Sequence, residues 1–108
     1  MAKATYWQRG ETLDYKNNTS ATIEANTIIV IGKRIGVIGT TIYPGEKGSL
    51  HVSGIYSIPK TADVEIALGA NVYFDGTAIT TTETDTPAGY AVEAAAADAA
   101  TVLVKLLG

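Results

Sequence analysis

The sequence predicts an all-β protein, a small single-domain β-sandwich or barrel with little or no helix. Short runs rich in β-branched residues recur about every 8–12 residues, with Gly, Pro or Asp between them. No segment keeps a helical period of apolar residues over several turns. The length of 108 residues suits one domain. We expect residues 1–108 to form that domain, with residues 1–9 as a short N-terminal arm.

The predicted strands combine Val, Ile, Thr and Tyr, which are residue types enriched in strands. They occupy residues 22–32, 34–43, 49–58, 64–68, 71–74, 78–82, 89–94 and 101–107. The alanine-rich segment 92–100 has strong helix propensity, so a short helix there is the alternative interpretation. We predict a hairpin, because these alanines directly join two β-patterned runs.

One hairpin is specific enough to predict a register. Asp75-Gly76 is typical of a two-residue type I′ turn. Such a turn would place Phe74 opposite Thr77 within the hairpin of residues 71–81.

The stretch "IYPGEKGSL", residues 42–50, has the composition of a phosphate-binding loop. A P-loop reads G-x-x-x-x-G-K-[ST] and opens a helix, but here Glu46 separates Gly45 from Lys47 and a strand-like run follows. Pro44 and Gly45 fit the central positions of a type II turn, where proline presets φ and glycine accepts a positive φ. We therefore predict a turn between strands and no nucleotide site. The predicted structural turns use Pro44, Gly45, Gly48, Gly54, Asp75 and Gly76.

Composition excludes several classes of partner. The net charge is −3, and the eight Lys and Arg form no cluster that could neutralise a row of phosphates, which argues against nucleic acid. The absence of cysteine excludes disulfides and thiolate metal sites. The start of the chain lacks the apolar run of a signal peptide, and no stretch approaches a membrane span. We therefore expect a protein of the reducing cytosol that has no membrane partner.

No constellation of residues predicts chemistry, so we expect no catalytic, cofactor-binding or metal site. His51 is the only histidine, and its neighbours Ser49 and Ser53 come without an orienting acid or a G-x-S-x-G elbow. Glu83 and Asp85 lie in a threonine-rich stretch without the glycines of a ligand loop, which favours a solvated loop. Sixteen of the hydrophobic residues are alanines, so large core side chains are few and oligomerisation could supply missing burial.

Several motifs follow one another along the whole chain. They are "MAKATYWQRGETLDY", "ANTIIVIGKRIGV", "IYPGEKGSLHVSGIYSIPK", "IALGANVYFDG" and "GYAVEAAAADAATVLVKLL". Their order and spacing resemble the small capsid cement (decoration) proteins of tailed bacteriophages and prophages, in the family catalogued as DUF2190. Two positions depart from the family pattern: Asn26 stands where glycine is usual, and Phe74 where tryptophan is common. Asparagine is well suited to a left-handed φ.

The resemblance implies a β-tulip-like, non-enzymatic domain that binds the major capsid protein on the exterior of the virion, after assembly in the host cytoplasm. Similar decoration proteins form trimers, with dimers among some relatives. It therefore implies a homotrimer, with a dimer as the alternative. The alternative function is a small β-rich binding module displayed on a particle, for example a carbohydrate-binding domain. Its aromatic residues would be Tyr43, Tyr56 and Tyr73.

The N-terminal arm is the predicted capsid-docking segment. Lys3 and Arg9 give it a charge of +2, which leaves −5 for the rest of the chain. Tyr6 and Trp7 add aromatic side chains, and Trp, Tyr and Arg dominate binding hot spots. An extended arm could also pair with an exposed strand edge of a partner. The opposite interpretation is that one of the two aromatic residues packs on the core of its own chain.

Overall fold

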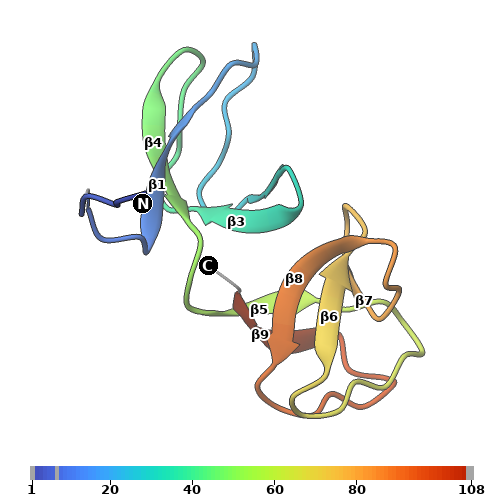
Figure 1. Cartoon of the computed structure of the whole chain (residues 1–108). Coiled ribbons are helices and arrows are strands. Elements are labelled where there is room, and N and C mark those ends of the chain that lie inside the picture. Colours follow the sequence, from blue (N-terminus) through green and yellow to red (C-terminus); the bar gives the residue numbers. More distant parts are fainter. Residues whose placement is uncertain (1, 7, 107–108) are drawn as a thin grey trace.

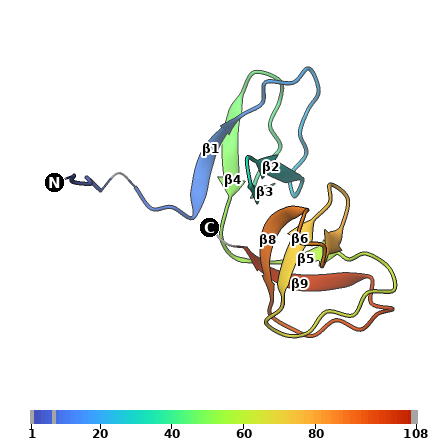
Figure 2. The ribbon, with the colours of Figure 1, turned by 45° about the vertical axis from the view of Figure 1, so that its right-hand side comes forward.

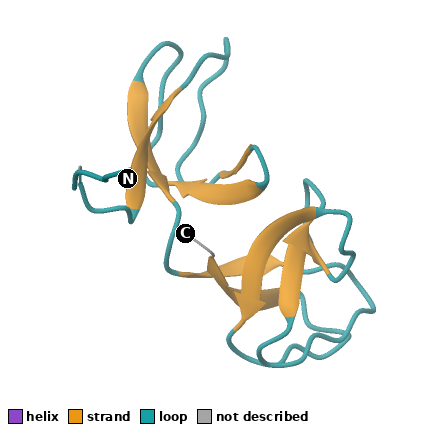
Figure 3. Cartoon of the chain, viewed as in Figure 1, coloured by secondary structure: helices purple, strands orange, loops and turns teal. Residues whose placement is uncertain are grey.

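The computed structural model describes residues 2–6 and 8–106 (Figure 1). These residues form nine strands and no helix (Figure 3), so no helix in this part of the chain could cross a membrane. The strands are β1 (Thr12–Lys16), β2 (Ile28–Ile31), β3 (Arg34–Ile38), β4 (Lys47–His51), β5 (Ile55–Pro59), β6 (Asn71–Phe74), β7 (Ile79–Thr80), β8 (Thr86–Ala91) and β9 (Thr101–Leu106).

The strands form two antiparallel sheets, which confirms the all-β prediction. The first sheet has the order β1-β4-β3-β2, and the second has the order β5-β9-β8-β6-β7. The second sheet curls until β7 meets the end of β5 through a single parallel bridge between Lys60 and Ile79. Neither sheet closes into a barrel, so the sandwich description holds.

The two sheets repeat one arrangement. We call residues 11–52 unit 1 and residues 54–106 unit 2. Strands β1, β4, β3 and β2 of unit 1 have the same order as β5, β9, β8 and β6 of unit 2. The same terminal hydrogen bond closes each unit: the N–H of Val52 donates to the Glu11 carbonyl, and the N–H of Leu106 donates to the Gly54 carbonyl, both at 3.0 Å. Unit 2 differs mainly by its longer connection, which carries β7, between β6 and β8.

A four-residue turn precedes two strands in each unit. Ile23 and Ile42 exchange backbone hydrogen bonds of 2.9 and 2.8 Å in unit 1, and Ile66 and Ala95 exchange bonds of 2.9 and 2.8 Å in unit 2. Each of these four residues is followed by a four-residue turn, closed by an N–H of its last residue and a carbonyl of its first. The turns are residues 24–27, 43–46, 67–70 and 96–99.

The third residue of three of these turns has a positive φ. It is Asn26 at 71°, Gly45 at 82° and Gly69 at 82°, which is the geometry of a type II turn. The type II turn predicted at Pro44-Gly45 is therefore confirmed. Asn26 adopts the left-handed φ for which asparagine was the expected substitute for glycine.

Each unit has its own apolar inner face. In unit 1 the inner face comprises Tyr15, Ile23, Ile29, Ile31, Ile38, Ile42, Leu50 and Val52. The structurally equivalent residues of unit 2 are Ile58, Ile66, Val72, Phe74, Ala91, Ala95, Val104 and Leu106, and all eight belong to the larger core cluster. The pairs Ile38/Ala91 and Ile42/Ala95 show that unit 2 uses smaller side chains at these positions.

The two units meet through different faces. Ile28, Ile35 and Val37 lie on the outer face of the β2–β3 hairpin, away from the inner face of unit 1, and join the core cluster of unit 2. The hairpin lies beside β8 and above the curled second sheet in both ribbon views (Figures 1 and 2). The outer face of unit 1 therefore covers the inner face of unit 2.

Several predicted boundaries differ from the structure. The run 49–58 is two strands, because Gly54 adopts a φ of 114° and the chain crosses there from one sheet to the other. The run 64–68 contributes only the bridge at Ile66. Strand β1 was absent from the predicted strands because its alternation of Thr, Asp and Lys resembles a polar arm.

The predicted register of the 71–81 hairpin is wrong. Phe74 lies opposite Ile79 rather than Thr77, because the loop has four residues. The Asp75 carboxylate explains this loop: its Oδ1 accepts hydrogen bonds from the N–H groups of Thr77 and Ala78 at 2.8 and 2.9 Å. This side chain–backbone pattern replaces the tighter turn.

The alanine-rich segment 92–100 contains no helix. It connects β8 to β9, which pair in antiparallel fashion, as the hairpin prediction requires. Ala95 is buried against Ile66, and a turn follows it. Tertiary pairing therefore overrides the helix propensity of alanine here.

Candidate interaction surfaces

The stretch that resembled a phosphate-binding loop is a turn that leads into a strand. The turn of residues 43–46 is closed by a hydrogen bond of 3.0 Å from the Glu46 N–H to the Tyr43 carbonyl. Lys47 then begins β4, so no helix N-terminus faces the loop. Gly48, expected in the turn, is the second residue of β4, where a Cβ would lie 2.5 Å from side-chain atoms of Ile42.

His51 occupies a structural position at the end of β4. Its ring covers Gly39, where an added Cβ would lie 2.5 Å from the His51 Nε2 atom. Ser49 is exposed on the same strand, whereas Ser53 lies beyond it in a bend. The contact with Gly39 is therefore a packing role for the His51 side chain.

The acidic residues of the threonine-rich stretch do not come together as a metal site. Asp85 accepts a hydrogen bond of 2.7 Å at Oδ2 from the Thr80 hydroxyl, and Glu83 is exposed. Within residues 2–6 and 8–106, no three His, Asp or Glu side chains are grouped closely enough to hold a metal ion.

The N-terminal arm extends away from the folded body (Figure 2). Tyr6 is 80% exposed, so it does not pack on the core of its own chain. Arg9 is also exposed and forms an ion pair of 2.9 Å with Glu11, just before β1. Lys3 is exposed as well, whereas Trp7 lies outside the described residues. The described part of the arm thus has exposed cationic and aromatic side chains.

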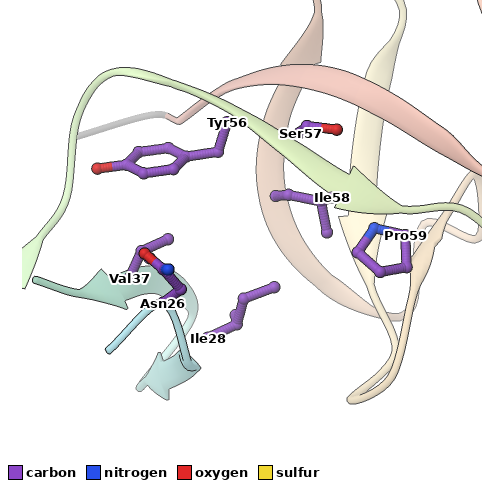
Figure 4. A pocket seen from close by; sticks show the side chains of 7 residues that line it. All are labelled: Asn26, Ile28, Val37, Tyr56, Ser57, Ile58 and Pro59. Carbon is purple, nitrogen blue, oxygen red and sulfur yellow. The ribbon is translucent and has the colours of Figure 1, made fainter. Parts of the chain in front are cut away.

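A cavity of about 280 Å³ lies at the junction of the two units. Figure 4 shows Asn26, Ile28 and Val37 of unit 1 facing β5 of unit 2 across it. The β5 side is lined by residues 56–59, of which Tyr56 and Ile58 belong to the inner face of unit 2. Among the described residues, no charged side chain lines the cavity, and Asn26 and Ser57 are the polar residues of a mainly apolar lining.

The three tyrosines of the alternative binding function do not form a platform. Tyr43 is 59% exposed in the turn of unit 1. Tyr56 packs against the core cluster on the inner face of unit 2, while Tyr73 points to the outer face, because its neighbours in β6 are buried. Stacking a sugar ring across these positions would require them to share one face.

The family model for "Phage cement protein" matches residues 7–106. The chain belongs to the phage cement protein family. No curated protein and no solved structure gives a significant match. A cement protein is a structural component of the virion that associates with the phage capsid, and the two-unit β structure is the scaffold on which this member presents its surfaces.

Some features of these surfaces could not be read from the sequence. The repetition of one unit leaves Ile23 and Ile66 as the only identical residues among the positions matched from residue 11 to residue 31 and from residue 54 to residue 74. The common signal is the three-residue spacing from Ile23, Ile42 and Ile66 to the left-handed residue of the turn that follows each, which is glycine or asparagine. Such a short spacing occurs often by chance, so it does not reveal the repeat in the sequence. The repeat becomes visible only from the strand order of the two sheets.

Proposed function

We propose that this protein is a capsid cement protein that binds the outer surface of a tailed-phage head as a homotrimer and stabilises the shell. The family match over residues 7–106 carries the proposal. The partner is the major capsid protein, and assembly takes place in the host cytoplasm. The chain acts by binding and not by catalysis, since the only nucleotide-like motif is a turn followed by a strand.

The N-terminal arm is the proposed anchor on the capsid. Its exposed Tyr6, Lys3 and Arg9 lie on an extended segment beside a body with net negative charge. Exposed aromatic and cationic side chains suit a binding hot spot. Trp7 belongs to the same proposed anchor.

Deletion of residues 2–9 tests the anchor directly. Among the residues that the structure describes, the arm has no strand and no backbone hydrogen bond to the body. We therefore expect the truncated protein to fold and oligomerise as before, while it no longer coats empty shells. Binding is measured by cosedimentation with shells that lack the protein, and shell stability by their melting temperature. Unchanged coating by the truncated protein would overturn the arm as the anchor.

A matched pair of tyrosines sharpens this test. Tyr6 and Tyr43 are both exposed, at 80% and 59%, but only Tyr6 lies on the arm. Tyr6→Ala should weaken shell binding about tenfold or more, as expected for a hot-spot residue, and Tyr43→Ala should leave it unchanged. If full-length protein does not bind shells at all, the cement function itself fails.

A further inference from the structure

The junction between the two units involves one face of each unit and leaves the other face of each unit without a partner in the described chain. Within the chain, the outer face of unit 1 covers the inner face of unit 2. Among the described residues, no second element packs in this way on the margins of the inner face of unit 1 or on the outer face of unit 2. A junction that joins two different faces is heterologous, and a heterologous contact can be repeated from one copy of a chain to the next.

The inner face of unit 1 is closed at its centre and open at its margins. Ile38, Ile42 and Leu50 are at most 1% exposed, whereas Tyr15, Ile23, Ile29 and Ile31 are only partly buried. Their equivalents in unit 2 are Ile58 at 2%, Ile66 at 1%, Val72 at 1% and Phe74 at 6% exposure. The difference comes from the covers: unit 2 is covered by the β2–β3 hairpin of unit 1 and by β7, and unit 1 has neither.

Leu13 extends this open face to the edge of the sheet. It pairs with Leu50, which is 1% exposed, so both side chains lie on the inner face. Leu13 itself is 39% exposed. Its equivalent in unit 2 is Tyr56, which packs against the core cluster and lines the junction cavity. Leu13 therefore marks the position that the intrachain junction would cover if it were repeated.

The outer face of unit 2 carries the equivalent of the covering hairpin. Ile28, Val30, Ile35 and Val37 of the β2–β3 hairpin have their equivalents in the β6–β8 pair of unit 2. These are, in the same order, Asn71, Tyr73, Pro87 and Tyr90. All four lie away from the buried side chains of their strands and remain at least partly exposed.

This outer patch has the composition of a protein interface. Tyr90 is flanked by Lys105, whose Nζ lies 5.9 Å from the centre of the tyrosine ring, and by Asn71 on the other neighbouring strand. Tyrosine is enriched at interfaces, because its ring is apolar and its hydroxyl can meet water or a partner.

We propose that the outer patch of unit 2 (Asn71, Tyr73, Pro87 and Tyr90) docks on the open inner face of unit 1 of a second copy, around Leu13 and Tyr15. The contact between copies repeats the junction inside the chain, and it closes as a head-to-tail ring. In the trimer proposed above, such a ring contains six units, each covering the next. This inference specifies the oligomer of the proposed function and does not involve the arm or the capsid.

Three matched substitutions test the two surfaces. Tyr73→Asp disables the outer patch, and Leu13→Asp disables the open inner face. Tyr43→Asp is the control, because Tyr43 is 59% exposed in the turn of residues 43–46 and belongs to neither proposed surface. Light scattering and sedimentation velocity on the free full-length protein should show an oligomer for wild type and Tyr43→Asp. Self-association of the other two variants should be at least about tenfold weaker.

Mixing the two disabled variants distinguishes a head-to-tail contact from a symmetric one. Each retains the surface that the other lacks, so a one-to-one mixture should form a heterodimer through a single junction and no ring. Circular dichroism melting of each variant shows that it is folded. A monomeric wild type would overturn the proposal, and so would a wild-type mass for Leu13→Asp or Tyr73→Asp. Dissociation by Tyr43→Asp, or a mixture that stays monomeric, would overturn it as well. Shell binding is scored separately, so a ring that does not coat shells would count against the cement function alone.

Discussion

Asn17 and Lys60 occupy equivalent positions in the two units, and each is a buried polar side chain that binds backbone carbonyls. Asn17 donates from Nδ2 to the carbonyls of Ala21 and Ile42 at 2.8 and 3.0 Å. Lys60 donates from Nζ to the carbonyls of Thr61, Val64 and Ala97 at 2.9, 2.6 and 3.1 Å. In both units the side chain follows the first strand, β1 or β5, and binds the carbonyl of the residue four positions later. It also binds a carbonyl at or just before the second four-residue turn, that of Ile42 in unit 1 and of Ala97 in unit 2. The two units thus use different residue types for the same structural role.

Lys60→Met should lower the free energy of unfolding by roughly 2–4 kcal/mol, because three carbonyls lose a charged donor and part of the site is closed to water. Lys60 is only 7% exposed. Lys33→Met, at the exposed tip of the β2–β3 hairpin, is the control and should change stability by less than about 0.5 kcal/mol. Urea unfolding of both variants provides the measurement. Equal stability of Lys60→Met and wild type would show that water replaces the ammonium group at no cost.

Gly89→Ala should disrupt the second sheet. Gly89 has a φ of 150°, and an added Cβ would overlap the backbone carbonyl oxygen of Lys105 on the adjacent strand. We expect a loss of about 3 kcal/mol or more, because the β8–β9 pairing must move to admit the methyl group. Gly10→Ala is the control, since a Cβ at Gly10 meets no atom within 4 Å. Comparable melting temperatures for the two variants would contradict the close approach of the strands.

Lys47 should have no part in nucleotide binding. It is the exposed first residue of β4, and the preceding turn offers no helix N-terminus to a phosphate. Isothermal titration with ATP and Mg²⁺ should give no heat of binding, and Lys47→Ala should leave shell binding unchanged. ATP binding that disappears in Lys47→Ala would restore the phosphate-loop interpretation.

The hairpin at Asp75 should lose stability in acid. Hydrogen bonds from the backbone N–H groups of Thr77 and Ala78, and from the Thr77 hydroxyl, lower the pKa of Asp75 below its ordinary value of 3.8. Because the folded pKa is the lower one, this contribution is complete above the ordinary value and is lost as the pH falls through the folded pKa. An NMR titration of the Asp75 carboxyl group should give a midpoint below 3.8.

Asp75→Asn separates this contribution from the general effect of acid. The variant should unfold more readily than wild type at about pH 6, and the difference should shrink as the pH falls through the folded pKa. Glu83→Gln, in the neighbouring exposed segment, should follow the wild-type acid profile. A constant difference between Asp75→Asn and wild type at every pH would show that the carboxylate charge is not involved.

The strand content was predictable because local pattern and tertiary structure agree over most of the chain. The run "NVYF" is β6, residue for residue, since its alternation matches the burial of Val72 and Phe74. Asn26 was predictable as a left-handed turn residue from its chemistry alone. The local pattern failed where individual side-chain contacts decided the outcome. The register at Phe74 is set by the carboxylate of Asp75, and Gly48 is required because the side chain of Ile42 packs on it.

The candidate surfaces were harder to predict than the fold. The exposure of Tyr6 could be expected from its place near a terminus. The open face around Leu13 and Tyr15 could not, because an exposed and a covered inner face have the same apolar pattern in sequence. Only the comparison with Ile58 and Ile66, which are covered at the equivalent positions, shows that something is missing.

The covering of unit 2 by the β2–β3 hairpin gives the chain an order of folding during synthesis. Residues 11–52 leave the ribosome first, and Ile28, Ile35 and Val37 then have no partner until the second half is complete. Residues 54–106 made alone would lack three members of their own hydrophobic cluster. A ribosome that stalls between the halves would therefore release a product whose hairpin exposes these apolar side chains, and exposed apolar surface of this kind favours aggregation.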